Sequence, residues 1–174
     1  NSGYMILKQA NNFYKMNKRL GIAKLIVKGA YSNIVKILSY YKNKRENIDD
    51  VLEEIKECKE GLKNAKSINI LMSNEANLRK IYYKAFDIIL NNSDFRFEKR
   101  SKRPPKNQLN TLISFGNSLL YVTVLSEIYK THLDPRIGFL HETNFRRFSL
   151  NLDIAEIFKP IIVDRLIFSL INKK

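Results

Sequence analysis

Residues 19–41 read RLGIAKLIVKGAYSNIVKILSYY and contain the clearest structural pattern in the chain. Apolar side chains recur there at intervals of three and four residues, which places them on one face of an α-helix. The apolar positions are Leu20, Ala23, Ile26, Val27, Ala30, Ile34, Ile37 and Leu38. Lys24, Lys28 and Lys36 fall on the other faces. The stretch therefore predicts an amphipathic helix.

Helical spacing continues along most of the remaining chain. Further helices are predicted over residues 6–16, 47–64, 68 or 73 to 90, 107–129 and 150–171. Segment 107–129 is apolar on nearly all sides, which predicts a central, buried helix. The last helix is expected to kink near Pro160 because proline lacks a backbone N–H. Segments 91–107 and 132–144 lack periodicity and are predicted to be loops.

The composition indicates an all-α protein of one domain, or a large piece of one. Six Gly and four Pro among 174 residues argue against a turn-rich β protein, and 44% apolar residues can form a core. The single cysteine, Cys58, cannot form an internal disulfide, so nothing implies an oxidising compartment. No apolar run approaches the ~20 residues of a membrane span, and no signal-peptide pattern is present. A cytoplasmic location without a membrane partner is therefore expected.

The charge of the chain is large and unevenly distributed. The formal net charge is +14. Residues 1–45 contain ten Lys and Arg and no acid, residues 46–60 contain seven acids and two lysines, and residues 96–106 contain six basic residues and one acid. Two basic zones separated by an acidic helix indicate a nucleic-acid-binding face and a solvated back. Ten unopposed positive charges argue against a helical protein–protein adaptor.

The second of the two histidines, His141, precedes a group of acids. His141 is followed at +12 and +15 by Asp153 and Glu156. These acids are three residues apart, so on a helix they share a face, and Lys159 follows one turn later. Carboxylates on a helix and an imidazole from a loop suit Mg²⁺ or Mn²⁺. By spacing alone, a salt-bridged or helix-capping arrangement is the more common explanation.

Two other features have a structural and a functional interpretation. His132 stands at a helix end, where a cation favours the C-terminal dipole, so we expect a structural role. The pairs Tyr40–Tyr41 and Tyr82–Tyr83 can stack on bases, but packing into an amphipathic core is the favoured interpretation.

Three ordered motifs carry a resemblance to a known family. They are FxxxxRSKRPPKNQLNTLISFGNSLLY from Phe95, LDPRIGFLHE from Leu133 and SLNLDIAEIFKPIIVDRLIF from Ser149. Together they closely resemble the CRISPR-associated integrases, the endonucleases of spacer acquisition in prokaryotic adaptive immunity. NEANLRKIYYKAF, from Asn74, is similar to the helix that supplies the first metal ligand of that family, although a Tyr–Tyr pair replaces the usual Tyr–Phe. The resemblance covers essentially all 174 residues.

The resemblance implies a fold and an activity. Members of the family have a small N-terminal β domain that mediates dimerisation, followed by an all-α catalytic domain. Residues 1–174 are expected to be part of this catalytic domain, with the β domain and the last C-terminal helices outside the sequence. The implied activity is that of a divalent-metal-dependent DNA endonuclease and integrase, which cuts and joins phosphodiesters to insert new spacers into the CRISPR array.

The resemblance also implies site residues and partners. Glu75, His141 and Glu156 correspond to the ligands of Mg²⁺ or Mn²⁺, and Asp153 to a catalytic acid that orients a ligand or replaces one. The basic positions assigned to DNA are Arg100, Lys102, Arg103, Arg147 and Lys159. Expected partners are duplex and branched DNA, the CRISPR repeat and the prespacer, a second copy of the full-length protein and a small CRISPR-associated adaptation protein. The alternative is a non-catalytic basic helical module that binds or bends DNA.

Overall fold

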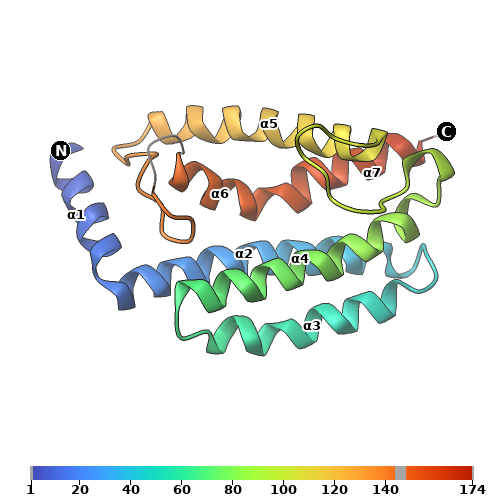
Figure 1. The fold of residues 1–174 in the computed structure, drawn as a ribbon, viewed down its shortest axis with the longest axis horizontal. Helices are drawn as coiled ribbons and strands as arrows, with labels where there is room; N and C mark the ends of the chain where they lie inside the picture. Colours follow the sequence, from blue (N-terminus) through green and yellow to red (C-terminus); the bar gives the residue numbers. More distant parts are fainter. Residues whose placement is uncertain (1, 144–147, 174) are drawn as a thin grey trace.

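The computed structural model describes residues 2–143 and 148–173, and these residues form helices without any strand (Figure 1). The elements are α1 (Ser2–Tyr14), α2 (Met16–Lys42), α3 (Ile48–Asn64), α4 (Ile68–Leu90), the 3₁₀ turn η1 (Ser93–Phe95), α5 (Gln108–Tyr129), α6 (Ser149–Lys159), the π-helical turn η2 (Pro160–Asp164) and α7 (Arg165–Asn172). The all-α prediction is confirmed, and most helix boundaries follow the predicted ones closely. The exception is α1, which begins four residues and ends two residues earlier than the predicted range 6–16.

Helix α2 lies at the centre of the packing. It contacts α3 and α4 on one side and α6 with η2 on the other. Figure 1 shows α2 and α4 running along the middle of the molecule, with α3 below them and α5 and α6 above. The short α1 projects at one end, beside the loop that joins α5 to α6. Two layers of helices therefore enclose the residues that the apolar spacing of 19–41 assigns to the core.

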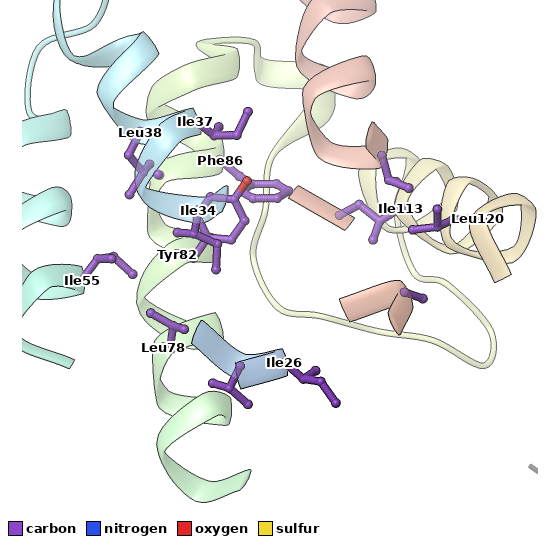
Figure 2. Close-up of a cluster of buried hydrophobic side chains, with 14 of the residues drawn as sticks. Ile26, Ile34, Ile37, Leu38, Ile55, Leu78, Tyr82, Phe86, Ile113 and Leu120 are labelled. Carbon is purple, nitrogen blue, oxygen red and sulfur yellow. The ribbon is translucent and has the colours of Figure 1, made fainter. Parts of the chain in front are cut away.

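The core consists of buried apolar side chains from several helices (Figure 2). Ile34 and Leu38 of α2 are fully buried, as are Tyr82 and Phe86 of α4. The rings of Tyr82 and Phe86 meet edge to face at a centroid distance of 5.2 Å. Each such side chain stabilises the fold by about 1.5–3 kcal/mol through burial of apolar surface. This packing confirms the core interpretation of Tyr82, and Tyr41 is also buried, at 8% exposed. The interpretation is wrong for Tyr40, which is 54% exposed.

Side-chain caps explain where two of the helices begin. Ser67 accepts a hydrogen bond from the N–H of Ile70 at the start of α4. Asn107 does the same for the N–H of Asn110 at the start of α5. Both caps satisfy a backbone donor that has no partner within the helix. At the other end of α4, Asn91 adopts a left-handed conformation with φ of 42°, which ends the helix.

The predicted kink at Pro160 takes the form of a π-helical turn. Proline cannot donate the backbone hydrogen bond that would continue an α-helix, and the wider turn of η2 accommodates this loss. Helix α5 approaches η2 closely at Gly116, where an added Cβ would lie 2.7 Å from a methyl carbon of Val163. A larger residue at position 116 would push the two helices apart.

The prediction that residues 107–129 form a central, buried helix is wrong. Phe115, Leu119 and Val122 on the outer face of α5 are 64%, 54% and 69% exposed. Among the described residues, α5 packs on α6, η2 and η1, and these elements leave the apolar residues of its outer face uncovered. The expectation that no stretch is apolar enough to span a membrane is also wrong, since α5 is long and apolar enough by length and composition alone.

Candidate active site

A pocket of about 760 Å³ brings together the side chains that the resemblance assigned to a metal site. Glu75 of α4, His141 of the loop before α6 and Glu156 of α6 all line it. Seven further lining side chains are basic: Arg79, Lys80, Lys84, Lys99, Arg100, Lys102 and Lys159. Residues from four separate parts of the sequence therefore meet around one cavity that carries excess positive charge.

The guanidinium of Arg79 bridges the two glutamates. Arg79 lies one turn after Glu75 on α4, and its Nε donates to Glu75 Oε1 at 3.0 Å. Its Nη2 donates to Glu156 Oε2 and, at 3.2 Å, to the backbone oxygen of Glu156. The Arg79 side chain is only 12% exposed. Burial would lower the pKa of Arg79, but Glu156 and Glu75 outweigh this effect and raise the pKa, so Arg79 stays positively charged.

A second cation neutralises Glu156. Lys159 stands three residues later on α6 and its Nζ donates to Glu156 Oε1. Burial would raise the pKa of Glu156, but Arg79 and Lys159 outweigh it and lower the pKa to about 2. Asn33 of α2 donates to the backbone oxygen of Ile157 at 2.8 Å and fixes this turn of α6 against the central helix. Glu156 is therefore ionised and held in place.

His141 is oriented by Asp153. Its Nδ1 lies 2.8 Å from Asp153 Oδ1, and its backbone N–H donates to the same oxygen at 3.0 Å. Asp153 Oδ2 accepts from the N–H groups of Phe139 and Leu140 at 2.6 and 3.0 Å. Donation from Nδ1–H to this carboxylate would leave Nε2 available as a ligand.

Asp153 and Glu156 thus have different surroundings, although both lie on α6. Asp153 is completely buried and does not line the pocket, because its carboxylate is directed into the preceding loop. Gly138 permits this close approach, since a Cβ there would lie 2.6 Å from the backbone carbon of Ser149 and 2.9 Å from Asp153 Oδ2. The geometry favours orientation of His141 by Asp153 over direct ligation.

The side chains of Glu75, Glu156 and His141 have ligand atoms of the types that hard divalent cations prefer. Two carboxylates and one imidazole nitrogen in a shared pocket suit Mg²⁺ or Mn²⁺. Within residues 2–143 and 148–173, however, no three His, Cys, Asp or Glu side chains are already arranged as a metal-binding cluster. Arg79 and Lys159 engage the carboxylates instead. Metal binding would therefore require Glu75 and Glu156 to release Arg79 and Lys159 and to bind the ion instead.

The basic residues assigned to DNA have distinct environments. Lys102 and Lys159 line the pocket. Arg100 also lines it, but its guanidinium donates to Asn110 Oδ1 at 2.9 Å and Ser114 Oγ at 3.1 Å, which ties the loop to α5. Arg103 is exposed and does not line the pocket. Arg147 lies outside the described residues.

Several pocket residues carry little signal in the sequence. The spacing of Arg79 from Glu75 is compatible with an ion pair, but its contact with Glu156 depends on the packing of α4 beside α6. The rings of Tyr83 and Phe97 stack at a centroid distance of 4.5 Å and form one wall. His132 is exposed and lies just after α5, away from this pocket.

The family model for CRISPR associated protein Cas1 matches residues 1–174. The chain belongs to the Cas1 family. It is 57% identical to CRISPR-associated endonuclease Cas1 2 of Thermodesulfovibrio yellowstonii, covering all of this chain and 53% of that protein. It is 53% identical to CRISPR-associated endonuclease Cas1 of Thermotoga maritima, covering 52% of it. The chain thus spans about half the length of the curated relatives it matches.

Solved structures share the Cas1 fold. A Cas1 protein from Thermotoga maritima superposes with a TM-score of 0.89 at 52% identity, covering 99% of this chain and 53% of that one. A casposase bound to integration product superposes with a TM-score of 0.83 at 27% identity, covering 98% and 50%. The predicted family and helical fold are confirmed.

Proposed function

We propose that this Cas1 chain provides the catalytic pocket of a divalent-metal-dependent DNA endonuclease and integrase that inserts spacers into a CRISPR array. The observation that carries the proposal is the convergence of Glu75, His141 and Glu156 in one basic pocket. The high identity to proteins named CRISPR-associated endonuclease supports it. The activity is a proposal because the chain spans about half the length of these relatives.

The residues of the pocket have separable roles in this chemistry. Glu75, Glu156 and Nε2 of His141 would hold the cation, which supplies charge neutralisation at the scissile phosphate and polarisation of its oxygens. Asp153 keeps the His141 proton on Nδ1 and so leaves Nε2 free to bind. The nucleophile is a DNA 3′-hydroxyl during integration and water during hydrolysis.

The lysines around the pocket hold the DNA backbone. Lys80, Lys84, Lys99 and Lys102 lie at the rim, where they would contact phosphates on either side of the reacting one. Burial lowers the pKa of Lys102, and the nearby Lys159 and Arg100 lower it further. An arriving phosphate would relieve this repulsion, which favours binding of a polyanion at this position.

The partners follow from the proposed reaction. We infer duplex and branched DNA, specifically a CRISPR repeat and a prespacer, as substrates. A second copy of the full-length protein and a small adaptation protein complete the proposed assembly. A Cas6-RT-Cas1–Cas2 complex contains a chain of the same fold at 24% identity. The proposed location is the cytoplasm, where the CRISPR array resides.

A second candidate is a non-catalytic DNA-binding module. The observation in its favour is that Arg79 and Lys159 already pair with the carboxylates, and the described part of the chain contains no preformed metal cluster. In that case the pocket would hold phosphates through its basic side chains alone. Binding of this kind needs no divalent ion, so metal dependence separates the two candidates.

The test is incubation of the protein with branched and duplex DNA in Mn²⁺, in Mg²⁺ and in EDTA. His141→Ala is compared with the control His132→Ala, which removes the other histidine, exposed and outside the pocket. The proposal expects metal-dependent strand cleavage or joining that persists in His132→Ala and disappears in His141→Ala. DNA binding without any metal-dependent chemistry in the unaltered protein would instead support the binding module.

A further inference from the structure

The loop that carries His141 is held by helix α1 as well as by α6. We call residues 130–143, between α5 and α6, the His141 loop. Gln9 of α1 donates from Nε2 to the backbone oxygens of Asp134 and Ile137 at 2.9 and 2.7 Å. Its Oε1 accepts from the N–H of Asp134 at 2.9 Å. One side chain therefore makes three hydrogen bonds to the backbone of a loop more than 120 residues away.

Gln9 is the one buried residue of α1 within its described range, Ser2–Tyr14, with 4% of its surface exposed. Both amide donors and the amide oxygen are used by the loop, so the side chain matches the backbone groups that face it. An apolar residue in this position would leave two backbone oxygens and one N–H without these partners. Burial of such groups is costly, which makes Gln9 specific to this loop conformation.

Arg19 of α2 provides a second attachment nearer to the histidine. Its Nε donates to the backbone oxygen of Phe139 at 2.9 Å, and its guanidinium lies 4.4 Å from the centre of the Phe13 ring. The N–H of Phe139 donates to Asp153. The residue two positions before His141 is thus held from α2 through its oxygen and from α6 through its nitrogen.

We propose that Gln9 and Arg19 are positioning residues for His141, because they fix the loop backbone against which Asp153 orients the imidazole. The proposal rests on the proposed function in one respect, namely that His141 is a metal ligand. Neither residue lines the pocket, so both act through the loop. Helix α1 projects at the end of the molecule (Figure 1), and most of its residues are exposed. Displacement of α1 would therefore reach His141 through these hydrogen bonds.

The first test measures the loop without metal. Gln9→Ala removes the three hydrogen bonds, and Asn11→Ala removes an amide from an exposed position on the same helix. Hydrogen exchange of the backbone amides of Phe139, Leu140 and His141 is followed by NMR. We expect exchange at least about tenfold faster in Gln9→Ala, because local opening loses three bonds, and unchanged exchange in Asn11→Ala.

The second test measures Mn²⁺ affinity by electron paramagnetic resonance. Loss of a direct partner of a metal ligand weakens metal binding by about 10–100-fold. Gln9 acts one step further away, so Gln9→Ala is expected to weaken Mn²⁺ binding by about 3–10-fold. Gln9→Glu keeps the acceptor for Asp134 but turns a carboxylate oxygen toward two carbonyls, and it should weaken binding at least as much. DNA affinity without metal should stay unchanged in both variants, because the basic side chains are intact.

Arg19 provides a comparison that does not depend on a buried residue. Arg19→Lys keeps a cationic donor for Phe139, whereas Arg19→Ala removes it. We expect faster amide exchange and weaker Mn²⁺ binding in Arg19→Ala, with partial restoration in Arg19→Lys. If Gln9→Ala does not fold, Arg19→Ala and Arg19→Lys still test whether the loop attachments position His141.

The outcomes separate the positioning role from the proposed metal site. Equal exchange rates and equal Mn²⁺ affinities in Gln9→Ala and Asn11→Ala would overturn the positioning role while leaving the metal site intact. Faster exchange together with unchanged Mn²⁺ affinity would overturn it too, because Gln9 would then only stabilise the loop. Absence of Mn²⁺ binding in the unaltered protein would contradict the proposed function itself.

Discussion

Replacement of Arg79 by methionine should destabilise the metal-free protein and strengthen its binding of Mn²⁺. In the metal-free protein, Arg79 holds Glu75 at 3.0 Å and also pairs with Glu156, and its side chain is 12% exposed. Methionine has a similar length but no charge, so Arg79→Met leaves two poorly solvated carboxylates with Lys159 as the only described counter-ion. Loss of one partner of a buried ion pair costs about 3–5 kcal/mol. Because Glu75 is 20% exposed and Lys159 remains, we expect about 3 kcal/mol.

The expected change is large enough for thermal unfolding. For a chain of this size, about 1 kcal/mol corresponds to about 2–4 °C, so the metal-free Tm should fall by about 6–12 °C. Mn²⁺ should restore much of this loss. The variant no longer has a built-in cation that competes for the carboxylates, and we expect its Mn²⁺ affinity to rise by about threefold or more, by Coulomb attraction to the uncompensated charge.

Differential scanning calorimetry and Mn²⁺ titration measure both effects. Lys80→Met is the control, because Lys80 is the next residue, lines the same pocket and is exposed. Its metal-free Tm should stay within about 2 °C of the unaltered value, as for most surface substitutions. Weaker Mn²⁺ binding in Arg79→Met, or an equal loss of Tm in Lys80→Met, would refute the view that Arg79 substitutes for the metal.

Four further predictions concern the pocket and the residues around it. Asp153→Asn keeps the shape but adds a donor where four donors already converge, so Mn²⁺ affinity should fall about 10–100-fold in a titration. Glu156 has a pKa lowered to about 2, so its contribution to stability is complete above the ordinary value of 4.5 and is lost as the pH falls through about 2. In the unaltered protein, the free energy of unfolding should therefore fall by about 3 kcal/mol between pH 4.5 and about 2 because of Glu156. Chemical denaturation of Glu156→Gln should lack this part of the pH dependence. Burial raises the pKa of Asp164 to about 6, despite nearby Arg79. Asp164 therefore stabilises the fold below the ordinary pKa of 3.8, and this stabilisation is lost as the pH rises through about 6. Asp164→Asn should remove this loss of stability with rising pH. Lys102→Ala should reduce the salt slope of DNA binding by about one, whereas Arg103→Ala, outside the pocket, should change it less.

Local pattern predicts the helices of this protein well because their apolar spacing is regular. The apolar positions predicted for 19–41 from Ala23 to Leu38 are buried. The α5 prediction was wrong because periodicity reports how apolar a helix is, and says nothing of how many neighbours cover it. Phe115 and Val122 satisfy the same pattern as buried residues but face outward.

The site is predictable only in part from the chain itself. Spacing placed Asp153 and Glu156 on one helix, but it could not show that Asp153 is directed into the loop while Glu156 faces the pocket. Glu75 could be connected with them only through the resemblance, because it comes from another helix. Gln9 lacks any pattern that distinguishes it from the asparagines that follow it, since its role depends on a loop more than 120 residues away.

The most direct test of the metal site is pulsed electron paramagnetic resonance of bound Mn²⁺, which detects nitrogen atoms bonded to the ion. The account predicts coupling to one imidazole nitrogen in the unaltered protein and in His132→Ala, and its loss in His141→Ala. Strand cleavage or joining in the same samples should follow the nitrogen signal. Bound Mn²⁺ without nitrogen coupling, or coupling that persists in His141→Ala, would contradict the assignment of Glu75, His141 and Glu156 as the metal ligands.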